Sequence, residues 1–206
     1  KELPPGLIAD TGFDVLTHAV EGFTASNAGT IPDLLAQDAF RTAFACLPAS
    51  YAGDRSVRLR LHMASTLAGI AFSRSGLGLC HAMAHVLGGR FHIPHGRLNA
   101  ILLPAVISGN APAAQAKYAR LARAAGLGGS ADTVALRNLK NGLIRLRKDL
   151  GLPQTLSQAG APPAQVWAAT GEIVEAVLAD PCCKTNPVPV EDYLVRRVLE
   201  EVTGNF

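Results

Sequence analysis

The segment Leu194-Val195-Arg196-Arg197-Val198-Leu199-Glu200-Glu201-Val202 carries its apolar side chains at helical spacing. Intervals of three and four residues separate them, which gathers them on one face of an α-helix. Segment 57–71 repeats the pattern with Val57, Leu61, Ala64, Ala68 and Ala71. The alternation typical of β-strands is nearly absent. The sequence therefore predicts an all-α fold, a single helical array in one domain over residues 1–206.

Start and stop signals divide this array into separate helices. Thr11 leads into the first helix, Pro32 opens the second, and Gly88-Gly89, Gly126 and Gly151 are expected helix ends. The predicted ranges are 12–25, 32–47, 54–73, 77–87, 96–109, 113–125, 131–150, 163–179 and 190–203.

Charge and composition exclude several classes of protein. Nineteen basic and sixteen acidic residues give a net charge of +3, and the basic residues are spread over several helices, so we expect no nucleic-acid partner. No apolar run reaches the ~18–20 residues of a membrane span, and the start lacks a signal-peptide pattern. The four cysteines show no CxxC spacing. We therefore expect reduced thiols in a cytoplasmic protein.

Two features point to partners of the chain. Only 17% of the residues are charged, so some apolar surface is expected to face a partner, and we predict a homo-oligomer such as a dimer. The chain also begins without methionine, directly before Pro4-Pro5. From this we expect a fragment or one domain of a longer protein.

The glycines of Gly76-Leu77-Gly78 do not form a dinucleotide-binding loop. No strand precedes them and the third glycine of that motif is missing. They are interpreted as a tight turn before a helix.

Five side chains capable of binding a metal lie on three short segments. Asp14 and His18 are four residues apart in a helical segment, so they share one helix face. His81 and His85 repeat this spacing, and His95 follows in a Pro-His-Gly turn. An unpaired carboxylate or imidazole among apolar neighbours would be costly, and a shared cation is the economical explanation.

One carboxylate and several neutral imidazoles suit Fe(II), Zn(II) or a neighbouring divalent ion better than Mg(II) or Ca(II). His62 and His92 are left out of the ligand set. His62 lies within a predicted helix without an acidic neighbour, and His92 precedes Ile93-Pro94, where a structural or pocket-lining role fits equally well.

These segments read TGFDVLTHAVE (11–21), GLGLCHAMAH (76–85) and IPHG (93–96). They resemble the C-terminal helical domain of the iron-containing, group III alcohol dehydrogenases, which have the dehydroquinate synthase-like fold. The likeness continues through Asn186-Pro187 to the end of the chain. One departure is Val86, where many relatives have proline.

The resemblance implies a role for each matching residue. Asp14, His18, His81 and His95 correspond to the metal ligands, and His85 to a histidine beside the nicotinamide that places the cofactor or relays a proton. In the family a loop like the one containing Cys182 approaches the substrate pocket.

The implied activity is the NAD(P)-linked interconversion of a primary or short-chain alcohol and its aldehyde, with Fe(2+), or Zn(2+), as a Lewis acid. The family's N-terminal nucleotide-binding domain, which would bind NAD or NADP, is absent from these 206 residues. A catalytically silent helical module, which binds metal or a partner, is therefore the alternative.

Overall fold

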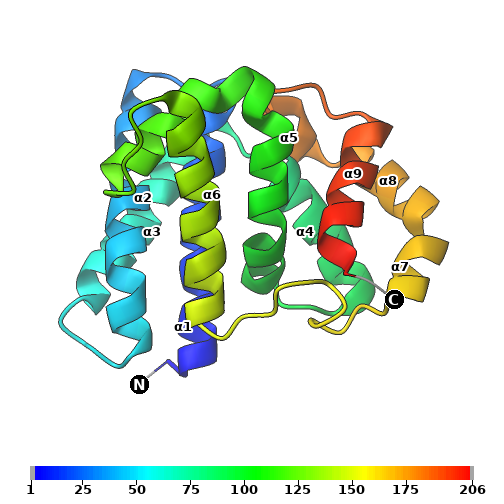
Figure 1. Cartoon of the computed structure of the whole chain (residues 1–206), viewed down its shortest axis with the longest axis horizontal. Coiled ribbons are helices and arrows are strands. Elements are labelled where there is room, and N and C mark those ends of the chain that lie inside the picture. Colours follow the sequence, from blue (N-terminus) through cyan, green and yellow to red (C-terminus); the bar gives the residue numbers. More distant parts are fainter. Residues whose placement is uncertain (1–2, 205–206) are drawn as a thin grey trace.

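The computed structural model describes residues 3–204, and within them every regular element is a helix (Figure 1), which confirms the all-α prediction. The helices are α1 (Pro5–Thr24), α2 (Thr30–Tyr51), α3 (Arg58–Ser75), α4 (Leu79–Phe91), α5 (His95–Ala124), α6 (Asp132–Asp149), α7 (Pro163–Ala168), α8 (Thr170–Ala179), the short 3₁₀ helix η1 (Pro181–Thr185) and α9 (Asp192–Thr203). None of them is long and apolar enough to cross a bilayer.

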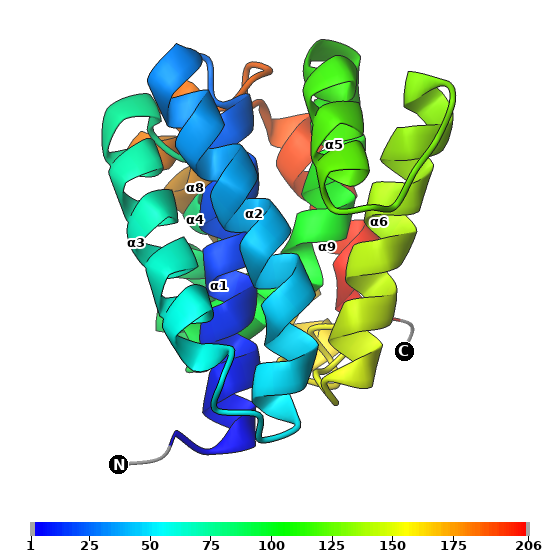
Figure 2. The ribbon, with the colours of Figure 1, turned by 90° about the vertical axis from the view of Figure 1, so that its left-hand side faces the viewer.

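Helices α1 and α5 form the centre of the array. Helix α1 packs against α2, α3 and α5, and Figure 2 shows it between α2 and α3. Its apolar stripe, which includes Phe13, Leu16 and Phe23, is fully buried. Helices α6 and α9 cover other sides of α5. Residues projecting from α1 and from the start of α5 are therefore held by the best-packed part of the molecule.

Helix α5 is one continuous helix, whereas the sequence predicted two, over 96–109 and 113–125. The predicted break was wrong although Pro104 and Pro112 lie inside the helix. Pro104 offers no N–H to the carbonyl of Ala100. Arg147 of α6 replaces that donor, since its Nη1 donates to Ala100 O at 3.0 Å and to Ile101 O at 3.1 Å. Burial lowers the pKa of this guanidinium to about 10.

The ends of several other helices differ from prediction. Helix α2 begins at Thr30, before Pro32, and runs to Tyr51 rather than ending at 47, and α3 begins at Arg58 rather than at 54. Helix α1 starts at Pro5 rather than after Thr11, because proline fits the first helical turn. Gly88-Gly89 lies inside α4 instead of ending it. The predicted helix 163–179 is divided into α7 and α8 at Ala169. Gly126 and Gly151 do follow helices, with φ of +74° and +66°.

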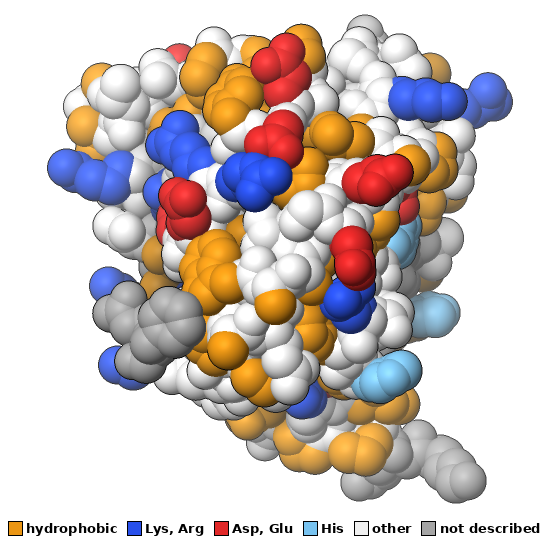
Figure 3. Space-filling view, turned by 90° about the vertical axis from the view of Figure 1, so that its right-hand side faces the viewer, with side chains coloured by type: hydrophobic (Ala, Val, Ile, Leu, Met, Phe, Trp, Pro, Cys, Tyr) orange, Lys and Arg blue, Asp and Glu red, His pale blue; other side chains and the backbone are white. Residues whose placement is uncertain are grey.

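Figure 3 shows the face that lies at the right of Figure 1, where α7, α8 and α9 are drawn. Acidic and basic side chains are interspersed there, and histidine side chains are exposed along one edge. An interspersed pattern of this kind is typical of a solvated surface.

Candidate functional site

Asp14 and His18 project from one face of α1, as their spacing predicts. His18 Nδ1 lies 3.8 Å from Asp14 Oδ2, and the two side chains are 21% and 27% exposed. The His18 ring stacks on Phe72 of α3 and on His81, with ring centroids 4.5 Å apart in both pairs. These contacts hold the imidazole between α3 and α4.

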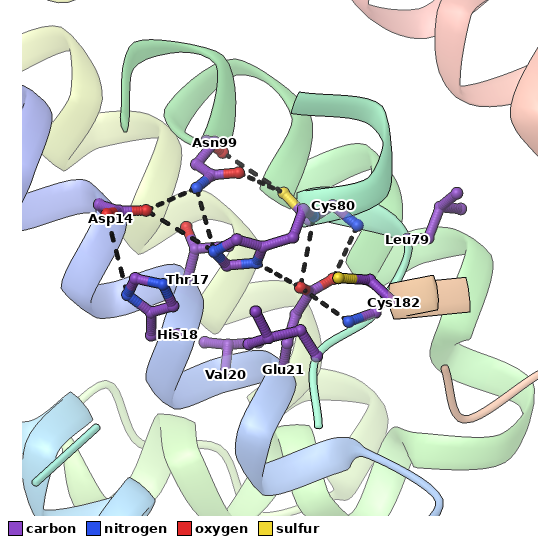
Figure 4. A network of polar contacts seen from close by, with 12 residues as sticks. Asp14, Thr17, His18, Val20, Glu21, Leu79, Cys80, Asn99 and Cys182 are labelled. Carbon is purple, nitrogen blue, oxygen red and sulfur yellow. Dashed lines mark hydrogen bonds and ion pairs between the residues drawn. The ribbon is translucent and has the colours of Figure 1, made fainter. Parts of the chain in front are cut away.

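His81 lies in the first turn of α4, and its ring nitrogens face the carboxylates of Asp14 and Glu21. Figure 4 shows these two carboxylates within the polar network. Nδ1 is 2.6 Å from Glu21 Oε2, and Nε2 is 3.7 Å from Asp14 Oδ1. The side chains of His81 and Glu21 are only 1% and 4% exposed. A hydrogen bond from Nδ1–H to Glu21 fixes the tautomer in which Nε2 is free to bind a metal.

Glu21 also caps the start of α4. Its carboxylate accepts from the backbone N–H groups of Gly78 at 3.0 Å, Cys80 at 2.7 Å and His81 at 3.4 Å. A Cβ atom at Gly78 would lie 2.9 Å from Glu21 Oε1 and 2.7 Å from Asn186 Oδ1. Residues 76–78 form an irregular connection between α3 and α4, so α4 starts at Leu79 rather than at 77 as predicted, and the glycine at 78 lets the carboxylate reach the helix N-terminus.

His95 is the first residue of α5, not part of a turn as predicted. The start of α5 lies directly on α1, since a Cβ at Gly96 would overlap the backbone oxygen of Asp10. Arg97 adds a bidentate pair to the Asp10 carboxylate, at 3.2 and 3.0 Å. This close approach places His95 Nε2 3.4 Å from Asp14 Oδ1.

Asn99, one turn after His95, completes the network. The fully buried amide donates from Nδ2 to Asp14 Oδ1 at 2.7 Å. The same nitrogen lies 3.4 Å from His81 Nε2 and 3.1 Å from His95 Nε2. One NH₂ group has two hydrogens and cannot donate to all three neighbours at once.

Sequence reasoning missed Glu21 and Asn99, although each has a spacing signal. Glu21 follows His18 by three residues and Asn99 follows His95 by four, so both lie on the helix face of a predicted ligand.

Electrostatics favour a cation at this cluster. Burial acts to raise the pKa of Asp14, but His81, His95 and His18 outweigh it, and the pKa lies far below its usual range. Burial lowers the pKa of His18 to about 4. Burial also acts to lower the pKa of His81, but Asp14 and Glu21 outweigh it and raise that pKa to about 9. His81 is therefore a proton-holding site between two carboxylates, which a metal ion could take over.

The predicted ligands come together in space. Asp14, His18 and His81 each offer one ligand atom, and these atoms lie within 4.8 Å of one another. The donor set of one carboxylate and three imidazoles, with His95 beside Asp14, suits a divalent transition metal.

His85 lies outside this cluster, one turn further along α4. Its ring stacks on that of His95, with centroids 5.3 Å apart. Its Nδ1 is 2.9 Å from Oδ2 of Asp180 in the loop between α8 and η1. Cys182 follows in η1, and its Sγ lies within 4.8 Å of ligand atoms of His85 and Asp180. Sequence reasoning did not single out Asp180.

The two histidines left out of the ligand set, His62 and His92, belong to neither group of metal-ligating side chains among the described residues. His92 adopts a left-handed conformation, with φ of +55°, where α4 ends. His62 is exposed on α3 and lines a cavity of about 490 Å³. Asp14 and His18 form part of the wall of the same cavity, between α1 and α3, and Cys182 does not.

Comparison with known proteins identifies relatives of the chain. The family model described as "Fe-containing alcohol dehydrogenase family, C-terminal" matches residues 8–203. The chain belongs to the iron-containing alcohol dehydrogenase family. As predicted, the chain resembles the C-terminal domain of these alcohol dehydrogenases and has the same all-α fold.

Individual relatives align with nearly the whole length of this member of the alcohol dehydrogenase family. It is 42% identical to the 1-propanol dehydrogenase of Citrobacter freundii over 97% of the chain and 56% of the relative. It is 37% identical to the NADPH-dependent butanol dehydrogenase of Clostridium saccharobutylicum over 97% and 52%. The crystal structure of a 1,3-propanediol oxidoreductase superposes with a TM-score of 0.90 at 33% identity, over 96% and 52%. The chain thus spans about half the length of these relatives.

Proposed function

We propose that Asp14, His18, His81 and His95 hold one divalent ion, Fe(2+) or alternatively Zn(2+). The observation that carries this proposal is the convergence of three imidazoles on the Asp14 carboxylate. His18, His81 and His95 each have a ring nitrogen 3.4–3.8 Å from an Asp14 oxygen. Three nitrogen donors and one carboxylate match the site chemistry of Fe(II) and Zn(II).

The surrounding residues fit such an ion without binding it. Glu21 holds the His81 Nδ1–H and leaves Nε2 as an acceptor. Asn99 holds one oxygen of Asp14. Outer hydrogen bonds of this kind fix ligand orientation and raise ligand basicity.

The proposed reaction is the NAD(P)-linked interconversion of a primary or short-chain alcohol and its aldehyde. When bound, the ion supplies Lewis acidity, which lowers the pKa of an alcohol hydroxyl toward neutrality. His85, stacked on His95 and 46% exposed, can contact the cofactor or carry a proton to solvent. Cys182, beside His85, is proposed to form part of the substrate pocket wall.

The proposed reaction needs a nucleotide-binding domain. We propose that it covers the side of the site where the side chains of His85 and His95 are 46% and 37% exposed.

We also propose that the complete protein forms a homo-oligomer. Large apolar side chains exposed on α2 and α3 support this second proposal: Ile31, Leu34, Leu59, Met63 and Ile70. Light scattering of the complete protein tests the assembly, and a clean monomer would contradict it.

The test of the metal site is the metal content of the purified complete protein, measured by mass spectrometry after anaerobic reconstitution. We expect close to one iron or zinc per chain, and none in a His81→Ala, His95→Ala double variant. The matched control is a His62→Ala, His92→Ala double variant. It removes two exposed histidines outside the cluster and is expected to keep the metal.

The same preparations decide between an enzyme and a silent module. Oxidation of short-chain alcohols by the metal-loaded protein, with NAD and NADP compared, supports the proposed reaction. Metal binding without turnover of any such alcohol would favour the silent module. A wild-type protein that takes up no metal would contradict both the site and the reaction.

A further inference from the structure

The His85–Asp180 pair joins two segments that are 95 residues apart in the chain. His85 comes from α4, and Asp180 from the loop that enters η1. The His85 Nδ1 to Asp180 Oδ2 distance is 2.9 Å, within the range of a direct hydrogen bond. The His85 side chain is 46% exposed, whereas that of Asp180 is only 12% exposed.

Asp180 is itself fixed in place by the start of η1. Its Oδ1 accepts from the backbone N–H of Cys182 at 2.8 Å. The end of η1 is anchored as well, because Thr185 Oγ1 donates to Leu77 O at 2.6 Å and Thr185 O accepts from the Ser26 N–H at 2.9 Å. Because both ends of this segment are held, the Asp180 carboxylate has a defined position and can orient the more exposed His85 imidazole.

The carboxylate of Asp180 stays ionised. Burial acts to raise its pKa, but hydrogen bonds from Cys182 and His85 outweigh this, and the pKa lies below its usual value. An ionised carboxylate only accepts hydrogen bonds. Nδ1 of His85 must therefore carry a hydrogen, and in the neutral imidazole this leaves Nε2, on the ring edge away from Asp180, with a free lone pair.

The second constraint on His85 comes from the proposed metal ligands. Its ring stacks on His95 at a centroid distance of 5.3 Å and an interplanar angle of 16°. One contact fixes the tautomer and the other fixes the ring plane. Together they leave the imidazole little freedom although nearly half of its surface is exposed.

We propose that Asp180 is a positioning residue that fixes the Nδ1–H tautomer and the rotamer of His85, so that Nε2 offers a hydrogen-bond acceptor to a donor group of the substrate or cofactor. The functional part of this inference rests on the proposed function, because it assigns His85 a partner in the active site. The alternative is a merely structural role, in which Asp180 only caps η1.

The Asp180→Asn variant separates these two roles. Its Oδ1 can still accept from the Cys182 N–H and keep the cap. Its NH₂ group would face His85 Nδ1 and favour the opposite tautomer, with the hydrogen on Nε2. In the catalytic triad of serine proteases the same exchange leaves the geometry intact but selects the wrong tautomer.

The first measurement is the ¹⁵N chemical shifts of the His85 imidazole in the complete, metal-loaded protein. We expect the Nδ1–H pattern in the wild type and a change to Nε2–H in Asp180→Asn. Thr185→Val is the control, because it weakens the η1 anchor but keeps the carboxylate, and it should retain the wild-type tautomer. An unchanged His85 tautomer in Asp180→Asn would overturn the proposal.

The second measurement is kinetic. We expect kcat/KM to fall about 10–100-fold in Asp180→Asn, the range found for hydrogen-bond partners of metal-ligating histidines, and Asp180→Glu to recover part of the loss. In a His85→Ala background, Asp180→Asn should cause no further loss, because the two residues act as a unit. A full additional loss in that background would show a structural role and overturn the proposal. The tautomer measurement needs no turnover, so it decides the role of Asp180 even if the protein proves not to be a dehydrogenase.

Discussion

Glu21 is the residue whose replacement tests the largest part of the site. In Glu21→Gln an amide NH₂ replaces one carboxylate oxygen, either Oε2, which accepts from the Gly78 N–H and from His81 Nδ1, or Oε1, which accepts from the Cys80 N–H. With the NH₂ in place of Oε2, His81 could restore its bond only by moving its hydrogen to Nε2, which faces Asp14, and the Gly78 N–H would lose its acceptor. In the other orientation the Cys80 N–H would lose its acceptor.

The structure sets the size of the expected effect. One lost bond to a charged group costs about 1.5–3 kcal/mol, and one buried unsatisfied donor costs about 1–3 kcal/mol. The free energy of unfolding of the metal-free protein should therefore fall by ~3–5 kcal/mol, a large share of the ~5–15 kcal/mol typical of a domain. Affinity for the metal should fall about 10–100-fold, because in either orientation a neutral amide replaces the ionised partner of His81.

Urea denaturation of the metal-free protein and chelator competition of the loaded protein measure the two effects. The control is Glu175→Gln, which changes an exposed glutamate on α8 and should alter neither quantity. If Glu21→Gln changes stability by less than about 0.5 kcal/mol, as an ordinary surface substitution does, and leaves metal affinity intact, the assignment of Glu21 is refuted.

Arg147→Met should lower the free energy of unfolding by about 2 kcal/mol in urea denaturation, because two α5 carbonyls lose the Arg147 donor. Arg145→Met, which changes an exposed arginine, is the control and should leave the free energy of unfolding unchanged. Equal losses in the two variants would contradict the role of Arg147 as a donor to α5. Gly96→Ala should destabilise by at least about 2 kcal/mol and weaken metal binding, because its Cβ meets the α1 backbone. By contrast, Gly89→Ala in open space should stabilise by about 0.5–1 kcal/mol in the same denaturation assay. Because the neutral form of His81 binds metal and its pKa is raised to about 9, a proton competes with the ion below that pH. The logarithm of metal affinity should thus rise by about one per pH unit from about pH 6 to 8, and a flat profile in chelator competition would contradict this.

Much of the site could be predicted because its parts are local. Asp14 and His18, like His81 and His85, share a helix face through four-residue spacing, which depends only on helix geometry. The sequence pattern also predicted most helices to within a few residues. At α5, where it predicted a break, a distant side chain had changed the local outcome. Helix α5 passes Pro104 while Arg147, from another helix, binds the carbonyl that the proline leaves free.

By itself, the sequence determined the all-helical fold, the spacing of the predicted ligand pairs and the family. Only the tertiary structure decided that Glu21 reaches across to cap α4 and fix His81, that Gly96 brings α5 against α1, and that Asp180 meets His85. The physical reason is distance along the chain. Helical periodicity records which residues share a face, but a contact between segments 57 to 95 residues apart depends on how whole helices pack and leaves no periodic trace in the sequence.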